Sequence, residues 1–187
     1  MQISRELKLV LPIYGEDEEM KLTVFVEPIS RLVFEAHYRI MAKTWSDLNS
    51  ANIGAVGLMT TASFALKDAA IELYGQEKGE ARYKAFMAEV MNGAKAVVPL
   101  SGSWQPTPYE NAVSTGHITD DDAAVVESLI AFFTLACRMV DPYWGKILRT
   151  GLQLNYGAQF ATSSFTEYLT TLPTLATAAS SGEKAAS

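Results

Sequence analysis

The chain has 187 residues, of which 49% are hydrophobic and 19% charged, a composition typical of one globular domain with enough apolar material for a core. Its formal net charge of -6 and its scattered Lys and Arg residues argue against a nucleic-acid-binding protein, because phosphate contacts need clustered cations. A single cysteine, Cys137, excludes an intrachain disulfide framework and a thiolate metal site, and its apolar surroundings indicate a buried structural thiol.

The first part of the chain predicts a β-hairpin. Residues 6–13 and 20–27 carry the alternation of a strand with one face on a core. They flank an acidic loop that contains Gly15 and is expected to be solvated rather than to bind a cation. Pro28 cannot donate to a sheet, so the second strand is expected to end just before it. Residues 1–8 lack the basic and then apolar pattern of a signal peptide, which predicts that the chain stays in the cytosol.

A core-facing helix is predicted over residues 31–48. Ser30 precedes it as an N-cap, whose side chain accepts a backbone N–H of the first turn. Ile29 and Phe34 have the spacing of a hydrophobic staple across this start. Apolar residues then recur in steps of three and four, so one stripe of the helix is expected to face the core. The members of that stripe are Phe34, Tyr38, Met41, Trp45 and Leu48.

Two further helices and an irregular segment are expected in the middle of the chain. Residues 56–74 are rich in small side chains, which allow close packing of a neighbouring helix, and Gly75 is placed to end this second helix. Residues 80–91 predict a third helix. Residues 94–109 hold three prolines and predict an irregular crossing segment. A short helix is expected to follow over residues 108–114.

The fourth predicted helix is the most apolar part of the chain. Thr119 and Asp122 form a capping box at its start, and the adjacent aspartates complement the helix dipole, which explains the acidic run without a metal ion. Residues 123–140 are apolar apart from one narrow stripe, a pattern typical of the central helix of a bundle rather than of a membrane span. The stripe consists of Glu127, Ala131, Thr134 and Arg138.

The end of the chain predicts two helices and a tail. Asp141 and Pro142 are placed as the cap and the first residue of a fifth helix. Ser164 and Glu167 form a second capping box, which predicts a short last helix. Residues 174–187 contain mostly Ala, Ser, Thr and Gly without an apolar period, and they are expected to be disordered.

These elements together predict a mostly α (α+β) fold. The β-hairpin occupies residues 6–27, and a bundle of about five to six helices follows over residues 30–173. Both parts are expected to belong to a single globular domain, residues 1–173, because the chain has enough apolar material for one core, and two small domains are the alternative. The disordered tail, residues 174–187, lies outside this domain.

The sequence contains no familiar catalytic constellation. His37 and His117 are eighty residues apart, and neither lies in a nucleophile, zinc or phosphate-binding motif. We therefore expect no catalytic residue, no cofactor, no metal ion and no enzymatic activity. An enzyme that uses dispersed carboxylates is the competing interpretation, and a deep polar pocket with perturbed carboxylates would distinguish it.

Three segments together resemble the tail assembly chaperones of long-tailed bacteriophages. They are residues 25–35 with the Lys43-Thr-Trp45 that follows, residues 120–137, and residues 156–159 with 166–174. Proteins of that family are small, mainly helical and acidic, and they are encoded just before the tape-measure gene. The resemblance implies a chaperone that holds the apolar, helical tape-measure protein soluble and helps to recruit tail-tube subunits around it, in the cytoplasm of the infected bacterial host.

The resemblance also implies the partners of the chain. These are the tape-measure protein and the major tail-tube protein, with neither nucleic acid nor a membrane, and self-association is left open. The apolar face of the fourth helix is wider than one neighbour needs, so its residues Phe132, Leu135 and Met139 are the predicted partner-binding residues. The alternative is a structural component of a phage tail or head-tail junction, which would remain in the virion.

Overall fold

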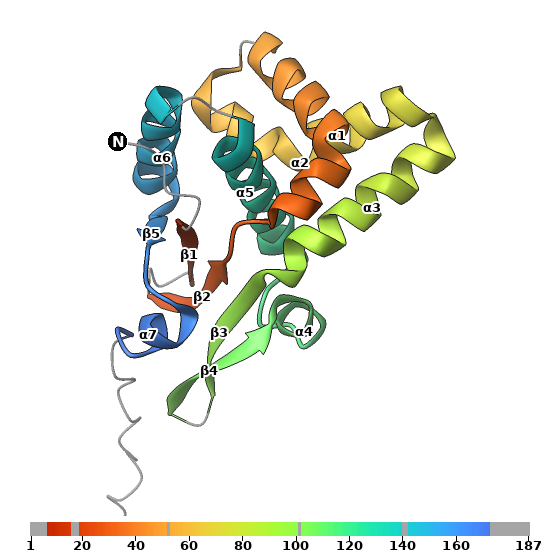
Figure 1. Ribbon diagram of the computed structural model, residues 1–187. Coiled ribbons are helices and arrows are strands. Elements are labelled where there is room, and N and C mark those ends of the chain that lie inside the picture. Colours follow the sequence, from red (N-terminus) through yellow and green to blue (C-terminus); the bar gives the residue numbers. More distant parts are fainter. Residues whose placement is uncertain (1–6, 16–18, 52, 101, 140–141, 173–187) are drawn as a thin grey trace, which may run out of the picture.

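The structure is a computed structural model that describes residues 7–15, 19–51, 53–100, 102–139 and 142–172. A cluster of helices covers one face of an antiparallel sheet, and a short helix lies on the other face (Figure 1). The strands are β1 (Lys8–Tyr14), β2 (Met20–Val26), β3 (Ala94–Leu100), β4 (Ser103–Pro108) and β5 (Gln159–Ala161). The helices are α1 (Arg31–Ser50), α2 (Gly54–Tyr74), α3 (Gln76–Asn92), α4 (Tyr109–Ser114), α5 (Asp120–Met139), α6 (Pro142–Tyr156) and α7 (Phe165–Leu169).

The amino-terminal hairpin is confirmed, and it forms the centre of a larger sheet. β1 pairs with β2 from Leu9↔Val26 to Tyr14↔Met20, and the strand order is β4-β3-β2-β1-β5. Alternate side chains face opposite sides, so Leu9 and Val24 join the large core under the helices, whereas Phe25 joins a second, smaller core on the other face. The fold is therefore α+β, with more sheet than the sequence predicts.

Residues 94–109 form mainly a second β-hairpin, so the prediction of an irregular segment is wrong. β3 pairs with β2 from Val26↔Ala94 to Thr23↔Val97, and β4 pairs with β3 along its whole length. Pro106 and Pro108 lie two residues apart in the edge strand β4, so their nitrogens point the same way. Because β4 stays paired with β3, these nitrogens point away from the ladder, where no hydrogen bond is lost.

The start of α1 is confirmed in detail, and four of the five residues of the predicted stripe face the core, with Phe34 and Trp45 partly buried against it. The Ser30 hydroxyl accepts the backbone N–H of Val33 at 3.2 Å. Met41 and Leu48 of the predicted stripe are buried, and so is Thr44, which the prediction leaves out. Tyr38 is half-exposed, because it lies outside the face on which α2 and α5 pack.

A single residue joins α2 to α3. Gly75 has a φ of +79°, a left-handed conformation that suits glycine, and it lets α3 begin four residues earlier than predicted, at Gln76. Gly79 then brings the two helices into backbone contact. A Cβ atom at Gly79 would lie only 2.5 Å from the Cα of Ile71 in α2.

The predicted role of α5 as the central helix of the bundle is confirmed. It contacts α1, α2, α3, α6 and strand β1, and eleven of its residues are buried. Its start is capped as expected, since the Thr119 hydroxyl accepts the backbone N–H of Asp122 at 3.2 Å. No helix in the described ranges is long and apolar enough to cross a membrane.

The last described elements complete the sheet and cover its second face. β5 is an edge strand that pairs with β1 through residues 159–161. The sequence did not predict β5, because a strand of three residues is too short to show a pattern. The capping box of Ser164 and Glu167 is confirmed at the start of α7. From α7, Tyr168 packs against Phe25 and donates a hydrogen bond to the hydroxyl of Thr23. The predicted cap Asp141 and the predicted tail lie outside the described residues.

Candidate functional site

The predicted partner-binding residues of α5 do not form an exposed surface. Phe132 and Leu135 are both 0% exposed, and Met139 is half-buried against the same core. The prediction that this face is available to a partner is wrong for the described conformation. The physical reason is that helices pack on several sides of α5 and cover the apolar surface that the sequence predicted to be left exposed.

The polar residues of α5 are used inside the molecule. Arg138 donates a hydrogen bond from its guanidinium to the carbonyl of Ile29, which ties the end of α5 to the junction between β2 and α1. Burial raises the pKa of the Glu127 carboxyl, which is half-buried. Burial and, secondarily, the charge of Glu127 raise the pKa values of Tyr83 and Tyr109. The Tyr109 hydroxyl also donates a hydrogen bond to the carbonyl of Ala123, which joins α4 to α5.

A buried pair of hydroxyls also joins α5 to α2. The Ser63 and Ser128 Oγ atoms lie 2.5 Å apart, and both side chains are buried. Each hydroxyl supplies the partner that the other needs away from water. The pair fixes the register of the two helices, and its short side chains let them approach closely.

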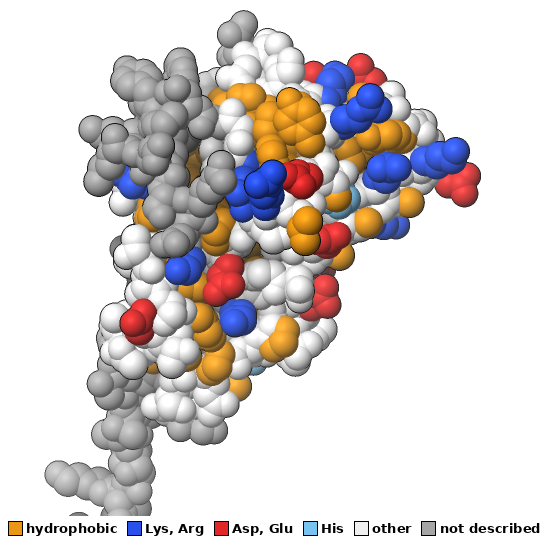
Figure 2. Space-filling model, in the orientation of Figure 1, with side chains coloured by type: hydrophobic (Ala, Val, Ile, Leu, Met, Phe, Trp, Pro, Cys, Tyr) orange, Lys and Arg blue, Asp and Glu red, His pale blue; other side chains and the backbone are white. Residues whose placement is uncertain are grey.

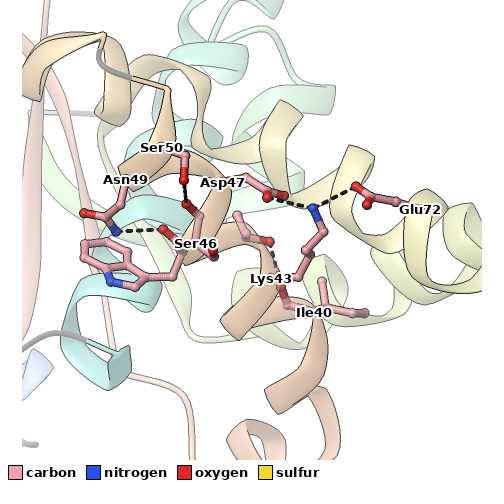
Figure 3. Close-up of polar contacts among 9 residues, drawn as sticks. Ile40, Lys43, Ser46, Asp47, Asn49, Ser50 and Glu72 are labelled. Atoms are coloured by element: carbon pink, nitrogen blue, oxygen red, sulfur yellow. Dashed lines mark hydrogen bonds and ion pairs between the residues drawn. The ribbon is translucent and has the colours of Figure 1, made fainter.

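An ion-pair cluster links α1 to α2 at the surface (Figure 3). The Lys43 ammonium lies 2.7 Å from a carboxylate oxygen of Asp47 and 2.8 Å from one of Glu72. Hydrogen bonding to Asp47 and then to Glu72 raises the pKa of Lys43. Because both carboxylates already pair with this lysine, the cluster serves as a bridge between two helices.

The two histidines lie in different parts of the fold. His37 sits between α1 and α3, with its ring 4.8 Å from that of Phe86 and its Nε2 atom 3.8 Å from a carboxylate oxygen of Glu89. Its Nδ1 atom is buried without a hydrogen-bond partner. His117 is half-buried in the loop between α4 and α5. Neither histidine lines one of the two clefts described below.

Within the described ranges, no group of three or more His, Cys, Asp or Glu residues is placed to hold a metal ion. The aspartates at the start of α5 act in helix capping, as the bonds between Thr119 and Asp122 show. Burial raises the pKa of the Cys137 thiol to about 12, so this cysteine stays protonated and unreactive at neutral pH.

A row of exposed apolar side chains begins at the start of α2. Val56 and Phe64 of α2 are 48% and 64% exposed, and Ile53, the N-cap residue directly before the helix, is 46% exposed; the three follow one another on one side, with Thr60 between the last two. We call these three residues the α2 patch. It spans about 16 Å along the helix axis. The sequence shows the spacing of the α2 patch as steps of three, four and four, with Thr60 included. The prediction for this helix used only its small residues, which mark its packed face.

Other exposed apolar residues are surrounded by charge. On the face shown in Figure 2, apolar side chains over α1 and α3 alternate with Lys, Arg, Asp and Glu. Leu32 of α1 is largely exposed, yet its sequence neighbour Arg31 and the nearby Glu35 form an ion pair at 2.6 Å. Single exposed apolar residues of this kind are common on soluble proteins. The α2 patch differs because its members form a row.

Among the clefts lined by described residues, two have a volume of about 340 Å³ each. The first lies between the end of β1, the first half of α5 and the end of α6, and we call it the β1–α5 cleft. The second lies between the end of α3 and the start of α4. Glu127, whose carboxyl has a raised pKa, lines neither of these two clefts.

Comparisons of the chain with protein-family models, with curated proteins and with solved structures found no match.

Proposed function

We propose that this protein is a non-enzymatic tail assembly chaperone of a long-tailed phage, which binds the tape-measure protein and helps to recruit tail-tube subunits in the cytoplasm of the infected host. The observation that supports the proposal best is the α2 patch. Exposed Val and Phe side chains along α2, extended by Ile53 at its N-cap, form a row that suits an apolar helical client, which offers side chains at a similar spacing.

The α2 patch replaces α5 as the client-binding surface in this proposal. Phe64 is its main anchor, because aromatic side chains dominate the binding energy of most protein interfaces. It projects from a helix whose opposite face packs on α5, so a client can bind without opening the core. No cofactor or metal ion takes part in the proposed mechanism.

Co-expression with a tape-measure fragment tests the proposal. The fragment is expected to be soluble with the wild-type protein and to aggregate without it. Phe64→Lys is expected to abolish this rescue, whereas Leu32→Lys, which places the same charge at a similarly exposed site on α1, is expected to preserve it. Rescue that survives Phe64→Lys would contradict the assignment to the α2 patch. Loss of rescue in both folded variants would instead indicate a nonspecific effect of charge.

The alternative function, a structural component of a tail or head-tail junction, makes a different prediction. A chaperone leaves before assembly ends, so the protein is expected to be absent from purified virions. Mass spectrometry of virions with an antibody control for lysate contamination separates the two functions. Stoichiometric amounts in the particle would favour the structural component.

A further inference from the structure

The β1–α5 cleft combines an apolar floor with an acidic rim. Its floor consists of side chains that are buried in the large core yet reach the cleft, namely Leu11, Ile13, Val126 and Leu129. Val125, 43% exposed, and Tyr14 stand at its walls. A water-filled cleft over such a floor is a favourable place for an apolar side chain from outside.

The edge of the sheet explains why this cleft stays open. β5 pairs only with residues 8–10 of β1, so the following residues of β1 have no neighbouring strand on that side. The chain instead turns at Gly157, which has a φ of +61° and packs against Pro12 and Tyr14. Pro12 lies within the unpaired stretch and carries no N–H, which disfavours the addition of another strand. An occupant must therefore bind through its side chains.

The one charged residue among the eleven described residues that line the cleft is acidic. Asp122 lines it, and Asp120 and Asp121 directly precede Asp122 on the exposed first turn of α5. The α5 dipole contributes only about half a positive charge at this end, which three carboxylates outweigh. No Lys, Arg or His is among the eleven residues that line the described cleft. The rim therefore attracts cations and repels anions.

We infer that the β1–α5 cleft is a second docking site, which takes the apolar side chains of a cationic amphipathic segment of a partner protein and pairs its Lys or Arg residues with the acidic rim. Two polar groups at the cleft add hydrogen bonds. Asn155 and Tyr156 line one side, and the Tyr156 phenol, whose pKa burial raises further above neutral, can donate a hydrogen bond. This inference does not depend on the proposed chaperone function, because the cleft shares no residue with the α2 patch.

Binding of two synthetic peptides to the full chain tests the inference. One peptide is an amphipathic helix with Leu and Trp on one face and Lys on the other, and the second has Glu in place of every Lys. Fluorescence anisotropy is expected to show saturable binding of the Lys peptide that weakens with added salt, and no binding of the Glu peptide. Equal binding of both peptides, or of neither, would overturn the inference.

Two matched pairs of variants locate the site. Val125→Lys is expected to weaken binding of the Lys peptide about tenfold, through loss of an apolar contact and addition of a like charge. Leu154→Lys makes the same charge change at a largely exposed position of α6 outside the cleft and is expected to leave affinity nearly unchanged. Equal losses in the two variants would mean that net charge alone governs binding, which contradicts the cleft.

The second pair removes a carboxylate. Asp122→Asn is expected to weaken binding about threefold, the scale of one exposed ion pair, and Asp120→Asn to weaken it less, because Asp120 does not line the cleft. Both substitutions neutralise one charge in the first turn of α5, so they affect its dipole similarly. An effect of Asp120→Asn as large as that of Asp122→Asn would also contradict the assigned position. Far-ultraviolet circular dichroism checks that all four variants are folded.

Discussion

The surroundings of two helical glycines, Gly79 in α3 and Gly151 in α6, predict opposite outcomes for their substitution by alanine. A Cβ at Gly79 would lie 2.5 Å from the Cα of Ile71 and 2.6 Å from the carbonyl oxygen of Ala70, both backbone atoms. A Cβ at Gly151 would lie 2.6 Å from a single atom, the Cε at the flexible end of Met59. The backbone of α2 can move away only by separating two packed helices, whereas the methionine can change rotamer.

The magnitudes follow from this difference. Alanine gains about 1 kcal/mol over glycine in a helix interior. Overpacking costs about 1 to 3 kcal/mol, and a contact with backbone atoms that cannot change rotamer lies at the upper end, so after the gain from alanine Gly79→Ala is expected to lower the free energy of unfolding by about 1 to 2 kcal/mol. The cost at Gly151 is small, and Gly151→Ala is expected to be neutral or to stabilise by up to about 1 kcal/mol.

Urea unfolding of the two variants measures these differences, with the midpoint compared at an unchanged slope. For a chain of this size, a loss of 1 kcal/mol also lowers the melting temperature by about 2 to 4 °C. A Gly79→Ala protein as stable as the wild type would refute the reasoning, because it would mean that α2 and α3 are not in backbone contact. A large loss in Gly151→Ala would show that the site around Met59 cannot relax.

Three further predictions concern stability. Phe132→Ala is expected to cost about 3 to 5 kcal/mol, the range for a large buried aromatic, whereas Phe64→Ala is expected to change stability by less than about 0.5 kcal/mol; similar losses in thermal or denaturant melts would contradict the distinction between core and patch. Ser63→Ala and Ser128→Ala are each expected to cost about 1 to 3 kcal/mol, because each leaves a buried hydroxyl without its partner, and the double variant is expected to cost less than the sum in a double-mutant cycle. Because the pKa of Glu127 is raised, the folded state holds the carboxyl proton more tightly than the unfolded state does. The stability that this proton adds is present below the pKa of Glu127 in the unfolded state and is lost as the pH rises through its pKa in the folded state. Glu127→Gln is therefore expected to be more stable, relative to the wild type, at pH 7 than at pH 4, and a difference between the two proteins that does not change with pH would contradict this.

Local signals in the sequence predicted much of the fold. Pro28 and Ser30 mark the end of β2 and the start of α1, and Ser164 with Glu167 marks the start of α7, because caps and breakers act within a few residues. The β3–β4 hairpin was missed for the opposite reason. Its prolines are compatible with a strand only at the edge of a sheet, and edge position depends on which strands pair.

The candidate site was harder to predict, because exposure depends on the whole fold. The apolar width of α5 was identified correctly, but the sequence does not show that helices on several sides and a strand would cover Phe132 and Leu135. The α2 patch has a visible helical spacing, yet its exposure depends on where α3 and α6 pack. The β1–α5 cleft is formed by three segments far apart in the chain, which no local pattern brings together.

The late position of β5 and α7 in the chain affects how the protein is made. Until residues 159–172 have been synthesised, Phe25 and Val97 lie on a sheet face without its cover, and one edge of β1 has no partner strand. An emerging chain therefore passes through a stage with a bare apolar surface, which is when most aggregation occurs. A chain released before residue 159 would keep this apolar surface exposed and would tend to aggregate. A chain that extends a few residues beyond Leu172 contains the elements that cover both cores.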